Sequence, residues 1–291
     1  MATDEPDLTL DLYEVKETGE YKSHTDELVR QHIISGFVIT VRRTIAVHGT
    51  YSKTDKTPTS LLAYRFKLSS KRSTADRRIR SLLVKLRFER DPKEDPIDDP
   101  CVLSYAPAEK GEIAINETVE IHNSSSSSRV NPSIGASGVK LSGEIAKQSG
   151  ALYEKKFYTN IQAEKLKSSR AGRKGEDLVQ FNLTENASQK DGVVDTFGVV
   201  AFVNRRDAGD KFKVHMDIKA EVDFRYTVGE AWEKVTGHRD KPLQVNPKDP
   251  NVAKPDGLET CEMGKFAESD MFERLAFLHL PESYNVTKFY N

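Results

Sequence analysis

The chain has 291 residues, 37% hydrophobic and 31% charged, which is enough for one large domain or two small ones. Its 44 basic and 45 acidic residues give a net charge of −1, so no overall field attracts nucleic acid, and we expect no nucleic-acid partner. With only two cysteines, Cys101 and Cys261, a framework of several disulfides is excluded. Two buried free thiols are the simpler interpretation, and a single bridge is the alternative.

The beginning of the chain carries no recognisable targeting signal. Residues 1–10 are acidic without an apolar run, and no stretch reaches the ~18 apolar residues of a transmembrane helix. Five Asn-x-Ser/Thr triplets match the glycosylation pattern, at Asn116, Asn123, Asn182, Asn186 and Asn285. Because no targeting segment accompanies them, we interpret them as chance matches and expect a cytoplasmic protein without a transmembrane segment.

Apolar and polar residues alternate in a series of segments, and this alternation predicts β-strands. Residues 1–30 are polar and predict a loose tail, with a short strand at 8–13 or a helical turn at 25–31. Strands are then predicted at 33–48, 62–68, 82–89, 101–105, 113–121, 139–145, 153–163, 178–183 and 197–203. The last of these is almost entirely apolar, which predicts a central strand buried on both faces.

The clearest alternation runs from Phe212 to Tyr226, where every second residue is apolar or aromatic and the residues between are charged or histidine. At about 3.4 Å per residue the segment spans roughly 50 Å, more than twice the usual strand. We therefore expect it to bend, to carry a bulge, or to pair with different neighbours at its two ends. The residues predicted to be buried are Val214, Met216, Ile218 and Val222, and those predicted to be exposed are Lys213, Asp217, Lys219 and Glu221.

Strands at short spacing, with turn residues between them, predict a mainly β fold: an antiparallel β-sandwich, or a flattened barrel, with irregular N- and C-terminal extensions. Amphipathic helices do not alternate with the strands, which argues against a Rossmann or TIM architecture. We expect an N-terminal tail over residues 1–30, a β-sandwich domain over 31–228, and a proline-containing extended arm over 229–291. In this arm, Ser269 is predicted to cap a short helix that runs through Leu278.

An acidic, proline-rich connection is the candidate metal site. Its carboxylates are Asp91, Glu94, Asp95, Asp98 and Asp99. Calcium takes about six to eight oxygen ligands, and loops at the end of a β-sandwich can supply them. Carboxylates on a solvated loop are the plainer interpretation, and we expect no other cofactor.

Two basic segments are candidates for binding an anion or an acidic partner. Their residues are Lys71, Arg72, Arg77, Arg78, Arg80, Lys165, Lys167, Arg170, Arg173 and Lys174. Aromatic residues do not interleave with them, so the sequence does not support a platform for stacking bases. Solvated loop charge is the favoured interpretation.

The seven histidines show no catalytic or metal-binding spacing, and neither a Gly-x-Ser-x-Gly elbow nor a glycine-rich phosphate loop is present. His48 is predicted at a strand end, a more usual place for function than the wet strand face predicted for His215. We nevertheless favour a structural role for His48 and a solvated ring for His215. A catalytic triad assembles in space, so its absence does not follow from spacing.

Two stretches carry a resemblance to known sequences. They are Asn182-Leu-Thr-Glu-Asn-Ala-Ser-Gln-Lys-Asp-Gly192 and the end of a predicted hairpin, Ile218-Lys-Ala-Glu-Val-Asp-Phe224. Both resemble a group of β-rich proteins from filamentous fungi that has no assigned activity. The resemblance covers roughly residues 35–226 and implies a β-rich domain and a fungal source. It implies no catalytic residues.

Three functions remain open. The favoured one is a non-enzymatic β-sandwich that binds a protein or a small molecule. The second is an enzyme with a site assembled from distant residues, for which a deep polar pocket near His48 or His122 is the expected sign. The third is a membrane-active, pore-forming-like β protein, in which the alternating Ser/Gly-rich stretch over residues 124–150 enters the membrane as a hairpin.

Overall fold

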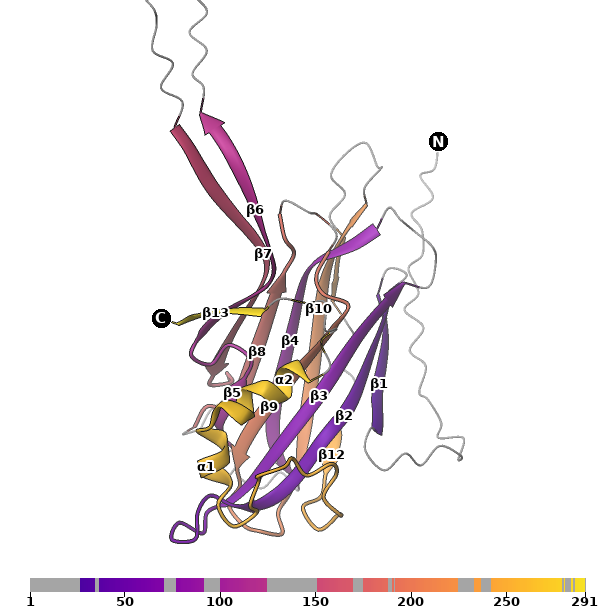
Figure 1. The fold of residues 1–291 in the computed structure, drawn as a ribbon. Coiled ribbons are helices and arrows are strands. Elements are labelled where there is room, and N and C mark those ends of the chain that lie inside the picture. The colour runs from indigo at the N-terminus through magenta and orange to yellow at the C-terminus, as the bar shows by residue number, and fades with distance from the viewer. Residues whose placement is uncertain are drawn as a thin grey trace, which may run out of the picture.

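A computed structural model of the chain describes residues 27–34, 37–70, 77–91, 100–124, 151–169, 175–187, 190, 192–224, 233–236, 242–278, 280, 284 and 286–290. The described strands form two open antiparallel sheets that pack face to face as a β-sandwich (Figure 1). The predicted mainly β fold is therefore confirmed.

The smaller layer, sheet A, has five strands in the order β1-β2-β3-β9-β5. Their bounds are β1 Glu27–Ile34, β2 Phe37–Thr50, β3 Pro58–Ser70, β5 Val102–Ala106 and β9 Thr196–Asn204. The larger layer, sheet B, has eight strands, seven of them in the order β11-β10-β4-β8-β7-β6-β13, with β12 paired to β10. Their bounds are β4 Arg77–Asp91, β6 Gly111–Ser124, β7 Ala151–Leu166, β8 Leu178–Thr184, β10 Lys211–Phe224, β11 Glu233–Thr236, β12 Leu243–Val245 and β13 Val286–Tyr290.

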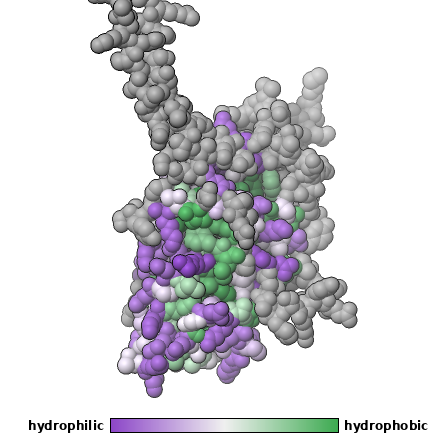
Figure 2. Space-filling view, in the orientation of Figure 1, coloured by the Kyte–Doolittle hydropathy of each residue, from purple (hydrophilic) through white to green (hydrophobic). Residues whose placement is uncertain are grey.

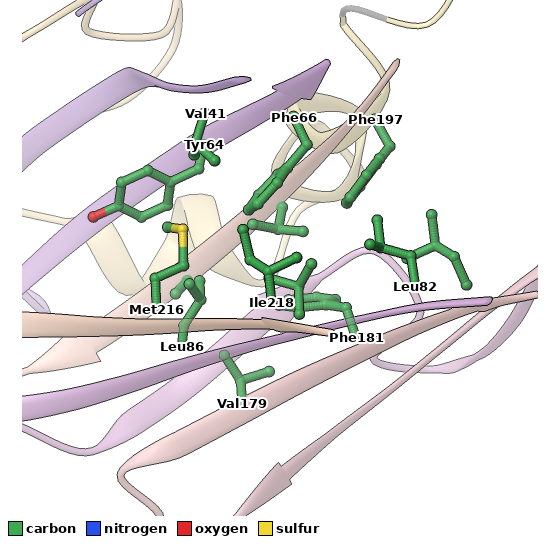
Figure 3. Packing of buried hydrophobic residues seen from close by; sticks show 14 of the residues in the cluster. Val41, Tyr64, Phe66, Leu82, Leu86, Val179, Phe181, Phe197, Met216 and Ile218 are labelled. Atoms are coloured by element: carbon green, nitrogen blue, oxygen red, sulfur yellow. The ribbon is translucent and has the colours of Figure 1, made fainter. Parts of the chain in front are cut away.

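The main core lies between the two sheets, where the apolar residues of each alternating strand meet (Figure 3). Phe66 of β3 and Phe197 of β9 stack with their ring centroids 4.8 Å apart. From the opposite sheet, Ile218 and Phe181 face them and are also buried. Apolar burial of this kind stabilises by about 25 cal/mol per Å², which makes it the main force that holds the sheets together.

A second apolar cluster covers the outer face of sheet A. Two short helices, α1 Met263–Ala267 and α2 Asp270–Phe277, pack there with residues such as Phe266 and Leu275. Because α2 contacts β9, that strand has one face in each cluster. The prediction of a strand buried on both faces is confirmed, since all seven residues 197–203 are buried. Gly198 is needed at this contact, since a Cβ at that position would lie 2.5 Å from the carbonyl oxygen of Ala276.

The long predicted strand is β10, with 14 residues. It pairs with β4 along its length, with β12 at Phe212–Val214 and with β11 at Lys219–Val222, and its register with β4 shifts between Glu221 and Val222. The prediction of a bulge and of different neighbours at the two ends is confirmed. The predicted facing also holds: Val214, Met216, Ile218 and Val222 are buried, Asp217 and Lys219 are exposed, and Lys213 and Glu221 are partly exposed.

The ends of the chain differ in part from the sequence interpretation. The helical turn predicted at 25–31 is wrong, because Glu27–Ile34 is an edge strand whose pairing with β2 decides its conformation. The strand predicted at 8–13 lies outside the described residues. In the region expected as an extended arm, β11, β12 and β13 join sheet B while the helices join sheet A. The cysteines are both free, but Cys261 is exposed, not buried, and Cys101 is partly buried.

The predicted helix after Ser269 is confirmed as α2. Ser269 has the extended backbone of an N-cap, yet its hydroxyl donates to the Phe266 carbonyl at 2.6 Å instead of capping α2.

On the side of the molecule seen in Figure 2, hydrophobic residues form a band through the middle of the described face. Large apolar side chains that remain exposed include Met271 and Leu278.

Candidate functional site

The feature that stands apart from the sandwich is a two-stranded ribbon. In it, β6 and β7 pair from Thr118↔Phe157 to Ser124↔Ala151. On one side, β13 pairs with β6 only as far as Ile115, and on the other, β8 pairs with β7 only from Asn160 onward. Among the strands that the structure describes, the ribbon therefore has no neighbour along either edge, and it runs beyond both sheets (Figure 1).

The ribbon begins at a β-bulge. The register between β6 and β7 shifts between Ile115 and Thr118, and Asn116 within this bulge has a φ of 56°, in the left-handed region. Asparagine adopts this conformation more readily than most residues do. A bulge bends its strand and increases the local twist, so this one marks where the ribbon leaves the plane of sheet B.

A buried side chain holds the bulge. The amide nitrogen of Asn186, in the segment after β8, donates to the carbonyl oxygen of Asn116 at 3.4 Å, and Asn186 is only 1% exposed. Neither asparagine was predicted to hold a bulge, because both were interpreted as parts of chance Asn-x-Ser/Thr triplets, and Asn186 also as part of the stretch that carries the resemblance. An asparagine inside a predicted strand is the signal that was available, since it favours a bulge or a turn over a regular strand.

The residues between the two ribbon strands were the focus of the pore-forming hypothesis. Residues 125–150, including the strand predicted at 139–145, lie outside the described residues. The strands on either side are described, and the 14 residues of β6 and 16 of β7 exceed the lengths expected from the alternation alone.

The acidic connection is described only at its start. Asp91 is the last residue of β4 and forms a 2.7 Å ion pair with Lys213 of β10. Glu94, Asp95, Asp98 and Asp99 lie outside the described residues. Within the part of the chain that is described, no group of three or more His, Cys, Asp or Glu side chains is arranged to hold a metal ion. Calcium binding by this connection stays a prediction.

The basic residues that are described lie at opposite ends of β8. Arg78 and Arg80 both pair with Glu185, at 2.7 and 3.0 Å, just after the end of β8. Lys165 lies beside Val179 near the start of β8 and pairs with Glu176 at 3.2 Å. Lys167 is exposed nearby, and Arg77 is the first residue of β4. Lys71, Arg72, Arg170, Arg173 and Lys174 lie outside the described residues.

His48 has the features of a structural histidine. Its Nδ1 atom is 2.8 Å from the Ser60 hydroxyl, on the paired strand. Burial, together with the positive charges of Arg205 and Arg43, lowers the pKa of His48 to about 4, so the ring is neutral at pH 7. A neutral histidine can be a general base, but its ring already has a fixed partner in Ser60.

The sequence predicts a solvated ring for His215, but the structure gives this ring a partner. Its Nε2 atom lies 2.9 Å from a carboxylate oxygen of Glu89 on the neighbouring strand β4. Arg87 donates to the same oxygen at 2.8 Å, so the three side chains form one polar cluster on the outer face of sheet B. His215 and Glu89 are close because β10 pairs with β4, and the alternation within one strand does not reveal this pairing.

No protein-family model and no curated protein sequence matches the chain. Solved structures that are similar include one titled "Pore forming protein", at a TM-score of 0.31 and 7% identity, over 76% of this chain and 94% of that one. Clostridium perfringens delta-toxin is similar at a TM-score of 0.26 and 8% identity, over 75% and 94% of the two chains. The membrane-inserted form of Clostridium perfringens NetB toxin is similar at a TM-score of 0.26 and 8% identity, over 76% of this chain and 93% of that one. At TM-scores this low the likeness carries no argument about this chain.

Both helices of the described chain are short, five residues in α1 and eight in α2. Neither one has the length and apolar character that a membrane crossing would require.

Proposed function

We propose that the protein is a membrane-active, pore-forming-like β protein whose copies assemble through the β6–β7 ribbon. The observation that carries the proposal is the ribbon itself, which has no neighbouring strand among those described along either edge. Each edge strand exposes backbone N–H and C=O groups, and such an edge is a ready template for a strand of another molecule.

Two paired strands without further strands beside them are marginally stable in water. Ribbons from several copies, joined edge to edge in a ring, would satisfy the hydrogen bonds of every edge. In a membrane this closure becomes obligatory, since an exposed backbone polar group costs several kcal/mol in lipid.

The described ribbon supplies part of the length that this role needs. A β-strand crosses a bilayer with about 9–11 residues, and the ribbon contributes residues 118–124 and 151–157, so the sequence between them would complete each crossing. In the sequence between them, Val139, Leu141 and Ile145 alternate with polar residues, the period expected of a strand with one face in lipid. The bulge at Asn116 would let the ribbon turn toward the membrane while the sandwich keeps its own pairing.

Dye release from liposomes tests the proposal. The wild type should release a small dye but retain a large dextran, since a pore has a limited diameter and a detergent-like lesion does not. Chemical cross-linking on the liposomes should give assemblies of several copies. A variant in which a short Gly/Ser turn replaces residues 118–157 should stay folded, because the pairing of β6 with β13 remains, and should neither assemble nor release dye.

Two results would contradict the proposal: no dye release by the wild type from neutral, anionic or sterol-containing liposomes, or equal release by the shortened variant. The melting temperature of the shortened variant is the control for folding. The binding module and the enzyme with an assembled site stay predictions that this experiment does not address.

A further inference from the structure

The outer face of sheet B has two adjoining hollows, of about 360 and 400 Å³. Both are lined by Gln180 and Asn182 of β8, so they form one depression that we call the polar groove. Its first part extends to Glu112 and Gln162 on β6 and β7, and its second part to Lys219 on β10. Each volume is within the ~300–1,000 Å³ range of small-molecule sites, but the lining is unusually polar.

Strand pairing builds the polar groove as a row across five strands. Lys219 lies opposite Leu83, Leu83 opposite Asn182, and Asn182 opposite Gln162. Gln162 in turn donates a hydrogen bond to Glu112, which ends the row. With about 4.8 Å between neighbouring strands, the row is roughly 19 Å long, enough for a short chain of rings laid across the sheet.

The amides of the polar groove are held by neighbouring carboxylates. Gln180 donates to Glu164 as Gln162 does to Glu112, and Asn160 donates to Glu112 at 3.3 Å. In Gln162 and Gln180, which line the groove, the amide nitrogen donates, so the amide oxygen keeps its capacity to accept, and each carboxylate has further lone pairs. The groove therefore presents fixed polar groups before any ligand arrives, which lowers the entropic cost of binding.

We propose that the polar groove binds a neutral oligosaccharide. A sugar hydroxyl both donates and accepts, and amides, carboxylates and the Lys219 ammonium together offer both functions along one row. Leu83, partly exposed in the middle of the row, supplies an apolar contact for the C–H face of a sugar ring. This binding activity is separate from membrane insertion, because none of the lining residues belongs to the β6–β7 ribbon.

Charge selects against other ligands. Glu112, Glu164 and Glu109 at the first part of the groove repel phosphates and other anions. At the other end Lys219 lies beside Glu221, so that end carries no net charge, and the amides between the two ends are neutral. The excess of carboxylates excludes anionic ligands, and a neutral ligand rich in hydroxyl groups can use the carboxylates, the amides and Lys219 along the whole row.

Isothermal titration of the full chain with neutral hexasaccharides tests the inference. The probes are the hexamers of β-1,3-glucose, β-1,4-glucose, β-1,4-N-acetylglucosamine and α-1,6-mannose. At least one should bind at millimolar or lower concentration. The double variant Gln180→Ala with Asn182→Ala removes two amide partners and should weaken that binding about tenfold or more.

The matched control is Lys211→Ala, on the same face of β10 but outside the groove, and its affinity should equal that of the wild type. The inference is overturned if none of the four hexamers binds, or if the double variant binds as tightly as the wild type. It is also overturned if a hexalysine peptide binds while the sugars do not, since the carboxylates alone would then define the surface. Sugar binding by the chain without its ribbon would show that groove and ribbon act independently.

Discussion

At the scale of single residues, the alternation of β10 makes neighbouring positions unequal. Val222 is fully buried against sheet A, whereas Glu221 beside it points to the outer face. Val222→Asp should lower the free energy of unfolding by about 3 kcal/mol or more, because it buries a charge without a partner. Glu221→Ala should change it by less than about 0.5 kcal/mol. Urea unfolding measures both, and equal losses would contradict this facing.

His48 links stability to pH. Its pKa is about 4 in the folded protein, below the ordinary 6.5, so between these values the unfolded chain binds the extra proton. The stabilising contribution of a neutral His48 is complete above pH 6.5 and is lost as the pH falls toward 4, by up to about 3 kcal/mol. His48→Gln keeps a side chain able to reach Ser60 but does not titrate. Urea unfolding at pH 6.5 and pH 4 should therefore show a smaller loss for this variant than for the wild type.

At the scale of elements, the bulge in β6 depends on the left-handed backbone of Asn116. Asn116→Gly should leave the melting temperature nearly unchanged, since glycine adopts this conformation without strain. Asn116→Val should destabilise by about 1–3 kcal/mol, because a β-branched residue is strained there. A valine variant as stable as the glycine variant would mean that the bulge is not needed for the native fold.

The contact between α2 and β9 leaves no room for a side chain at Gly198. Gly198→Ala should cost about 1–3 kcal/mol and speed proteolysis of the C-terminal helices, because a Cβ would lie 2.5 Å from a backbone oxygen. The control is Gly209→Ala, whose Cβ would meet only the flexible end of Lys248 at 3.4 Å. Similar protease sensitivity in the two variants would contradict close packing of α2 on β9.

At the scale of the whole molecule, stability should be distributed unevenly. Amide hydrogen exchange followed by mass spectrometry should be slowest in β9, which is buried on both faces, and fastest in the ribbon, which lacks neighbours among the described strands. The measurement needs dilute protein, because assembly would protect the ribbon edges. Ribbon amides as slow as those of β9 in a monomer would show that the edges are covered.

Much of the fold was predictable because strand alternation is local. The alternation in β8, with Val179, Phe181 and Leu183 on one face, predicts a strand with one buried face whatever its neighbours are, and the alternation in β10 does the same. The same pattern also sets which residues are polar and outward. Gln180 and Asn182 could thus be placed on a wet face, although nothing marked them as part of a groove.

The sequence by itself determined the mainly β class and the faces of strongly alternating strands such as β8 and β10, because the period of two lies within each segment. It did not predict β1, which is an edge strand where a helical turn was expected, or the short strands β11, β12 and β13. Only the tertiary structure decided which strands are neighbours, since an alternating strand fits many partners equally well. That choice placed Glu89 beside His215, and Lys219, Asn182 and Gln162 in one row. It also left the ribbon beyond its neighbours, because β13 and β8 end their pairing near the bulge, a long-range outcome that no local pattern encodes.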